Sequence, residues 1–360
     1  MKYALCIGHL AYDIILPMEG FPEENTKYQI DRTLESSGGP AANAAVLMAR
    51  WGIRTGFIGS AGRDSYGERA LEDLQSSGVD TRYVHRMEQG STPLSIILVN
   101  TNNGSRTIIN RRGEGFIRTE ETTTLFDALK DTPPDLLLFD GHEPDASHAA
   151  LEYFPEAISI LDAGSLRRGT ELLAPRVDYC IASERFAREV AGTAPLEPSL
   201  AEVATEPPIA SHDGHFSLCR SLLATLERRG IQHPVITLGE GGCCFLEPVD
   251  AALNSTLHSR TSMNEASSIP EPAPISDVKK SFLLSAYPAK AVDTTGAGDV
   301  FHGAFAAALL LGKSFQEALI VATVAAGLSV ERLGGKPGIP TLEEVSDTLE
   351  RWNPSLYILG

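Results

Sequence analysis

The sequence predicts an α/β fold in which a parallel sheet is covered by helices on both faces. Short apolar or β-rich segments alternate with helix-like segments along most of the 360 residues, which is the pattern of a doubly wound sheet. The candidate strands are almost continuously hydrophobic, as strands buried on both faces are. Length alone is compatible with one large domain or two smaller ones.

The elements follow one another in a regular order. Strands are expected, in chain order, at residues 3–7, 55–58, 136–139, 158–161, 179–182 and 234–238. Helices are expected at residues 41–51, 66–77, 219–229, 299–311 and 315–333. Several of these helices run into a glycine, where a left-handed residue can close the last turn, at Gly52, Gly78, Gly230 and Gly312.

Two segments predict a small antiparallel sheet that stands off the main body. Residues 27–35 alternate polar and apolar side chains, and β-prone runs at residues 94–99 and 106–110 flank the turn Asn102-Asn103-Gly104. Because these segments flank candidate ligand loops, we expect lid strands at about 27–35 and 94–110. Edge strands of the main sheet are the alternative.

Two further stretches have the composition of insertions. Residues 195–216 and 248–280 are rich in Pro, Ser, Glu and Ala and have no usable apolar period. We expect long surface loops or disorder there, inserted into a single domain that spans residues 1–360.

Charge and hydropathy exclude several classes of function. The 47 acidic and 30 basic side chains give a formal net charge of −17, so nucleic acid is not an expected partner. No apolar run reaches the roughly 20 residues that span a bilayer, and His9 and Asp13 interrupt the N-terminal run that could resemble a signal peptide. We therefore expect a cytoplasmic protein with no membrane partner. The five cysteines lack CxxC spacing and predict reduced core thiols.

The run AVDTTGAGDVFHGA, which begins at residue 291, carries the clearest chemical signal. The turn Gly296-Ala297-Gly298 precedes a helix, whose unpaired N–H groups and partial positive charge form an anion site that suits a phosphate. Asp299 lies on the first helical turn and could accept a proton from a hydroxyl that attacks the phosphorus. A plain helix-start aspartate is the alternative for this motif taken alone.

A second motif, GGPAAN, lies near the N-terminus. Gly38 and Gly39 permit close approach of a ligand to the backbone, and Pro40 suits a first helical turn. Asn43 has an amide able to bind hydroxyl groups. Pro40 and Asn43 could also be ordinary helix-start residues.

The pairing of GGPAAN with DTTGAGD, about 250 residues apart and in this order, resembles the ribokinase-like (PfkB-type) carbohydrate kinases over nearly the whole chain. The resemblance implies a doubly wound three-layer α/β/α sandwich with a small β-sheet lid that closes over the sugar. It also implies ATP as phosphoryl donor and Mg²⁺ as counter-ion. Asp299 matches the family's catalytic base, and Gly296, Ala297 and Gly298 match its anion hole.

Other family positions map onto this chain. Asp13 matches an acidic residue that binds sugar hydroxyls, although it could be a turn carboxylate. Thr237, Gly239 and Gly242 match a nucleotide-binding loop, although a simple β-turn would look similar. The run Gly334-Gly335-Lys336-Pro337-Gly338 resembles a loop near the adenine and a site for a monovalent cation such as K⁺.

One motif departs from the family. Many relatives carry Asn-x-x-Glu, linked to magnesium and phosphate, where this chain has Ser183-Glu184-Arg185-Phe186. Glu184 could still act on the metal through water. The ketohexokinase-like and sulfofructose kinase-like branches tolerate a similar loss.

The lid residues suggest the substrate. Lys27, Tyr28, Asn110, Arg111 and Arg112 are expected to face the sugar, and Lys27 with Asn110 resembles the sulfofructose kinase branch, in which a lysine holds an anionic sugar. The run STPLSIILVNTNNGSRTII also resembles ketohexokinases. His142 lies where the sulfofructose branch offers an arginine.

These resemblances predict an ATP-dependent kinase for a ketohexose-like sugar, either fructose or an anionic derivative. A nucleoside (adenosine-type) kinase and a non-catalytic sugar- or nucleotide-binding regulator are the alternatives. A homodimer formed through the lid is left open.

Overall fold

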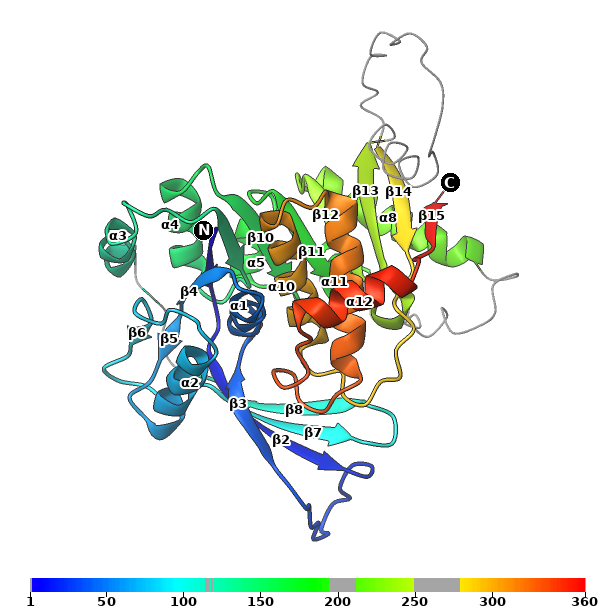
Figure 1. Cartoon of the computed structure of the whole chain (residues 1–360). Coiled ribbons are helices and arrows are strands. Elements are labelled where there is room, and N and C mark those ends of the chain that lie inside the picture. The colour runs from blue at the N-terminus through cyan, green and yellow to red at the C-terminus, as the bar shows by residue number, and fades with distance from the viewer. Residues whose placement is uncertain (1, 114–116, 118, 194–211, 249–278, 360) are drawn as a thin grey trace.

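The computed structural model shows a three-layer α/β/α sandwich with a four-stranded lid (Figure 1). It describes residues 2–113, 117, 119–193, 212–248 and 279–359. The large sheet has nine strands in the order β15-β14-β13-β12-β11-β10-β9-β1-β4. The six predicted strands are confirmed and lie side by side in parallel, as β1 (Tyr3–Ile7), β4 (Arg54–Ile58), β9 (Leu136–Phe139), β10 (Ile158–Ala163), β11 (Tyr179–Ser183) and β12 (His233–Thr237).

An antiparallel extension of this sheet was not predicted. It comprises β13 (Cys243–Pro248), β14 (Lys279–Leu284) and β15 (Leu356–Leu359). The stretch between β13 and β14 has no apolar period, so the sequence gives little sign that these two short strands pair with each other.

Helices cover both faces of the sheet and bury two separate apolar cores. One face packs against α1 (Pro40–Arg50), α2 (Ser65–Ser76), α10 (Ala297–Leu310), α11 (Phe315–Val330) and α12 (Leu342–Arg351). The other packs against α3 (Thr119–Asp127), α4 (Pro144–Tyr153), α5 (Arg168–Leu173), α6 (Glu184–Ala191) and α8 (His212–Arg228). The five helices that the sequence predicted are all present, and the glycines after four of them have positive φ, at Gly52, Gly78, Gly230 and Gly312.

The lid is a mixed sheet in the order β3-β2-β7-β8, and the antiparallel prediction is therefore only partly right. β7 (Leu94–Asn100) and β8 (Arg106–Arg111) form the expected antiparallel hairpin. β2 (Ala11–Met18), which was not predicted as a strand, runs parallel to β7. A further two-stranded sheet joins β5 (Ser60–Ala61) to β6 (His85–Arg86).

The strand predicted at residues 27–35 is wrong for most of its length. β3 covers Leu34–Gly38 and pairs with Ala11–Ile15 of β2, whereas residues 27–33 have no strand partner and are largely exposed. Alternating polarity alone therefore did not locate the strand, because the segment that pairs with β2 begins only at Leu34.

The two predicted insertions fall mostly outside the described residues. Within the described part, residues 212–216 are helical as the start of α8, which corrects the loop expected there. Residue 248 ends β13, and residues 279–280 begin β14. All five cysteines are free and buried, as predicted.

Among the described residues, the helices are too short or too polar to cross a bilayer.

Candidate active site

The predicted site residues gather where the parallel strands end and two helices begin. Ligands of open α/β sheets bind at the carboxyl ends of the strands. His9 follows β1, Asp140 follows β9 and Asp162 lies near the end of β10. The N-terminus of α10 carries Asp299, and that of α1 carries Asn43.

The turn before α10 is open at the position where an anion would lie. Gly296 is the N-cap of the helix, with φ 74°. A Cβ built on Gly298 would meet no atom within 4 Å, so this part of the turn faces free space. The first N–H groups of a helix lack intrahelical acceptors and attract negative charge. The turn is therefore a suitable cradle for a phosphate.

Asp299 is half-buried and is bound by Asn43. Asn43 Nδ2 donates to Asp299 Oδ2 over 2.7 Å, which joins the first turns of α1 and α10. The two helices approach closely because Gly303 has no side chain, since a Cβ there would lie 3.0 Å from Ala44 Cα.

The electrostatic surroundings of Asp299 make it a better base than an ordinary aspartate. Burial, together with the negative charge of Asp162, raises its pKa from 3.8 to about 7, although the Asn43 hydrogen bond opposes this. A carboxylate with a pKa near neutrality is suited to accept a proton.

His302 is a buried group beside Asp299 whose position in the site was not predicted from the sequence. Its Nδ1 lies 2.5 Å from the Gly298 carbonyl oxygen and 3.3 Å from Asp162 Oδ2, and its Nε2 lies 3.2 Å from the Ile181 carbonyl oxygen. Oxygen atoms therefore face both ring nitrogens. The sequence does contain a sign of this residue, because His302 follows Asp299 by three positions, and residues three apart share one face of a helix.

Asp13 lies on β2, one of the lid strands. Burial raises its pKa from 3.8 to about 6, and a hydrogen bond from Ser95 partly offsets this. Gly38 makes room for the carboxylate, because a Cβ at that position would lie 2.0 Å from Asp13 Oδ2. Gly39, with φ 110°, lets the chain pass close to the His9 carbonyl. The glycine pair thus places Asp13 beside the start of α1.

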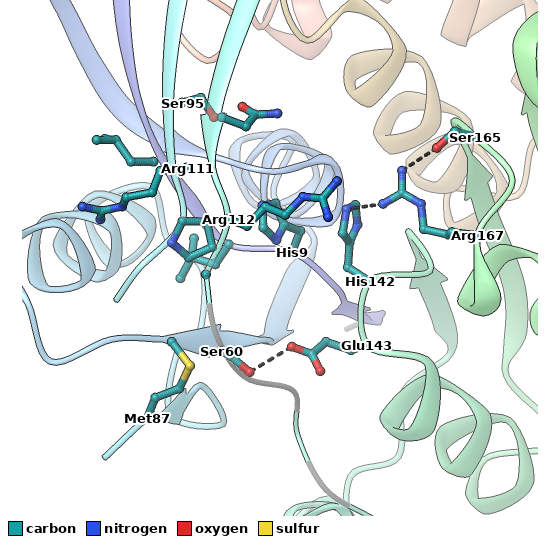
Figure 2. Close-up of a pocket in the computed structure, with 15 residues that line it drawn as sticks. His9, Ser60, Met87, Ser95, Arg111, Arg112, His142, Glu143, Ser165 and Arg167 are labelled. Carbon is teal, nitrogen blue, oxygen red and sulfur yellow. Dashed lines mark hydrogen bonds between the residues drawn. The ribbon is translucent and has the colours of Figure 1, made fainter. Parts of the chain in front are cut away.

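A cavity of about 540 Å³ opens between the lid and the strand ends (Figure 2). Ser95, Asn110, Arg111 and Arg112 line it from the lid, while His9, His142, Glu143, Ser165 and Arg167 line it from the main body. Ser95 also contacts Asp13, to which it is directly opposite in the β2–β7 pairing. Ser95 therefore links the cavity to Asp13, although Asp13, Asn43 and Asp299 are not among the described residues that line it.

The lid residues named from the sequence separate into two groups. Asn110, Arg111 and Arg112 line the cavity, whereas Lys27 and Tyr28 lie in the exposed segment before β3 and do not line it. The Arg111 guanidinium donates to the Thr92 carbonyl over 2.8 Å and lies over the Tyr66 ring, 5.6 Å from its centroid. In Figure 2, Arg111 accordingly points away from His142, and Arg112 points toward it.

The positions matched to a nucleotide loop lie at a tight turn. Thr237 ends β12, and its hydroxyl donates to the Ala182 carbonyl over 3.4 Å. Gly239 and Gly242 have positive φ in the turn that follows, and a Cβ on Gly242 would lie 2.0 Å from the Leu284 carbonyl oxygen. This turn needs its glycines for backbone reasons alone, so their nucleotide role stays a prediction.

The predicted metal residue is held by a neighbour. Arg188 Nε donates to Glu184 Oε1 over 2.8 Å. Across the described residues, no group of three or more His, Cys, Asp or Glu side chains is placed to hold a metal ion. In that part of the chain, the side chains alone therefore do not form a metal site.

The loop at residues 334–338 packs against the anion turn. Asp293, which is buried, accepts from Thr295 N and from Gly334 N, both over 2.8 Å. Lys336 pairs with Asp73 over 2.6 Å and so does not reach toward the turn. The loop supports the backbone around Gly296, and a monovalent-cation role stays a prediction.

Known proteins share this architecture and sequence pattern. The chain is 25% identical to a ribokinase of Lactococcus lactis subsp. lactis over 98% of both chains, and 36% identical to mouse (Mus musculus) ketohexokinase over 30% of this chain and 36% of that protein. A structure of Arabidopsis thaliana ribokinase, complexed with ribose and ATP, superposes with a TM-score of 0.69 at 22% identity, over 97% of this chain and 98% of that one. The family model "pfkB family carbohydrate kinase" matches residues 1–342. The protein therefore belongs to the PfkB family of carbohydrate kinases, phosphotransferases that act on sugar hydroxyls.

Proposed function

We propose that the protein transfers the γ-phosphoryl group of ATP to a hydroxyl of a ketohexose-like sugar, with Asp299 as general base. The observation that carries the proposal is the half-buried Asp299, which has a raised pKa and directly follows the open turn at Gly298. This pairs a proton acceptor with a phosphate cradle, as phosphoryl transfer to an alcohol requires.

In the proposed reaction, Asp299 removes the proton from the sugar hydroxyl as its oxygen bonds to the γ-phosphorus. The bond from that phosphorus to the bridging oxygen breaks, and ADP leaves with the electron pair. The N–H groups of the turn at Gly296, Ala297 and Gly298 stabilise negative charge on the transferred group. Mg²⁺, when bound with ATP, neutralises phosphate charge.

Unsatisfied groups near Asp299 support a hydroxyl-rich substrate. Asn43 is only 6% exposed, and its Oδ1 has no hydrogen-bond partner among the described residues. A sugar hydroxyl can donate to this oxygen, and others can bind Asp13. A bound sugar would thus satisfy a buried acceptor that the folded chain leaves unpaired.

The ketohexose assignment rests on the resemblance of the lid hairpin to ketohexokinases and on the 36% identity to mouse ketohexokinase over 108 residues. A nucleoside kinase is disfavoured by the cavity, because its described lining residues include no Phe, Tyr or Trp on which a base could stack. A non-catalytic regulator would have no chemical need for a base with the raised pKa of Asp299.

A coupled ADP-release assay across fructose, fructose phosphates, ribose and adenosine tests the proposal. We expect turnover with a hexose in the presence of ATP and Mg²⁺. If adenosine is the only compound of the panel that is phosphorylated, the protein is a nucleoside kinase. If a compound binds but none is phosphorylated, the result favours a non-catalytic regulator.

We also propose that two copies of the chain pair through β8. This strand forms an edge of the lid, and Ile108 and Ile109 on it are 44% and 56% exposed. An exposed apolar edge strand favours pairing with another strand. Ile109→Lys should lower the mass measured by light scattering from that of a dimer to that of a monomer. A wild-type monomer at micromolar concentration would contradict this.

A further inference from the structure

Positive charge collects on the cavity between the lid and the main body. Arg112 follows β8, and Arg167 lies directly before α5, on the opposite wall (Figure 2). His142 lies between them in the close-up and stacks on His9, with the ring centroids 4.5 Å apart. Two arginines and two imidazoles thus face a single space.

Arg167 is held in place by Ser165 and His142. Its Nη2 donates to Ser165 Oγ over 2.7 Å, and its Nη1 contacts His142 Nε2. Within the described part of the chain, neither Arg167 nor Arg112 forms an ion pair, although several other arginines do. Their charges are available to a ligand in the cavity.

The nearby carboxylates are already occupied. Asp140 accepts from the backbone N–H groups of His9, Ala41 and His142. Glu143 accepts from Ser60 Oγ and from Ile117 N, both over 2.9 Å. Burial also raises the pKa of Glu143 from 4.5 to about 7, which reduces its negative charge near neutral pH. Of the described residues that line the cavity, Arg112 and Arg167 therefore carry positive charge without a carboxylate partner, whereas Arg111 lies 3.8 Å from Asp64.

We propose that Arg112 and Arg167 bind the acidic group of the sugar, and that the preferred substrate is a hexose with a carboxylate, sulfonate or phosphoryl substituent. Guanidinium groups bind such oxyanions through two parallel hydrogen bonds. This inference rests on the proposed kinase function and names the substrate class of that site.

The position of the two arginines determines which end of the sugar is acidic. Asp299 receives the acceptor hydroxyl, and it is not among the described residues that line this cavity, whereas Arg112 and Arg167 are. Ser95, which contacts Asp13, lines the same space. A sugar bound at Asp13 can thus present its acidic group to the arginines and its acceptor hydroxyl to Asp299. The two arginines replace Lys27 as the anion-binding group expected from the sequence.

The test compares kcat/KM for fructose, 2-keto-gluconate and fructose 6-phosphate in the wild type, Arg112→Met and Arg167→Met. Arg168→Met is the matched control, because that adjacent arginine is exposed and pairs with Asp145 over 2.9 Å. We expect the wild type to prefer at least one acidic hexose over fructose. Each cavity variant should lose ~10–100-fold on that acid and much less on fructose, as expected for loss of a charge-assisted contact. Arg168→Met should behave as the wild type does.

The two acidic probes distinguish a carboxylate from a phosphoryl group as the preferred ligand. The inference would be overturned if the wild type has a higher kcat/KM for fructose than for both acids, and if the ratio of these kcat/KM values is the same in Arg112→Met and Arg167→Met. The kinase function would remain intact. If no sugar is phosphorylated, the proposed function fails, and calorimetric titration of the wild type and Arg112→Met with the same acids decides the inference. Acid binding that is lost in the variant supports it, and absence of binding to the wild type overturns it.

Discussion

Replacing Asp299 by Asn should make the protein more stable at alkaline pH while it abolishes phosphoryl transfer. Asn has nearly the same shape and can still accept the hydrogen bond that Asn43 donates over 2.7 Å. It cannot take a proton, and loss of a general base costs ~10²–10⁴ in rate. The gain in stability follows from the burial that makes the carboxyl group a useful base.

The size of the gain follows from the pKa. The folded state raises the pKa of Asp299 from 3.8 to about 7, so the folded protein holds this proton more tightly than the unfolded chain does. The stability that the protonated group confers is complete below pH 3.8 and is lost as pH rises to about 7. The full difference corresponds to at most ~4 kcal/mol of unfolding free energy, of which ~3 kcal/mol is lost between pH 5 and pH 8. Asn does not titrate and avoids this loss.

Urea unfolding of the wild type and Asp299→Asn at pH 5 and pH 8 measures the effect. The advantage of the variant should be larger at pH 8 than at pH 5. Asp347→Asn is the control, because that aspartate is exposed on α12 and should show no such difference. The difference in unfolding free energy between Asp299→Asn and the wild type could instead be the same at both pH values, or smaller at pH 8. Either result would refute the claim that Asp299 is desolvated in the folded protein.

Three further substitutions test the surroundings of the site. Asp162→Asn removes the negative neighbour that helps to raise the pKa of Asp299. The acid limb of the pH profile of kcat/KM, expected near pH 7, should therefore move to lower pH. An acid limb at the wild-type pH would show that Asp162 does not act on Asp299. Gly298→Ala adds a methyl group that meets no protein atom within 4 Å, so the melting temperature should hold or rise while the KM for ATP increases; an unchanged KM would show that phosphate does not approach this turn. Gly303→Val inserts atoms beside Ala44, where even a Cβ would lie 3.0 Å from its Cα, so both the melting temperature and kcat should fall; wild-type values would mean that the close approach of α1 and α10 is not needed.

The sequence predicted the parallel part of the main sheet because its signals are local. Strands buried on both faces are continuously apolar, and glycines with positive φ end the helices. The edge strands β13, β14 and β15 have no such local mark, since β14 begins 31 residues after β13 ends and its partner β15 is formed by the C-terminal residues 356–359. Pairing between distant segments is set by tertiary contacts rather than by local pattern.

The candidate site shows the same division. The motifs placed Asp299, Gly298 and Asn43 together because each motif fixes a helix start, and the two helices pack side by side. The pair Arg112 and Arg167 could not be found in this way. These arginines come from two loops far apart in the sequence, and only the fold brings them to one cavity. Lys27 had the more suggestive local context but lies outside this cavity.

The most direct test of the central claim follows the phosphoryl group itself. ³¹P NMR of ATP, Mg²⁺ and the best hexose of the substrate panel should show, with the wild type, a new phosphomonoester signal that grows in step with ADP. With Asp299→Asn, the same signal should form ~10²–10⁴-fold more slowly, while titration with a non-hydrolysable ATP analogue gives unchanged affinity. A phosphomonoester that forms at the wild-type rate in Asp299→Asn, or inorganic phosphate as the only product of the wild type, would contradict the account.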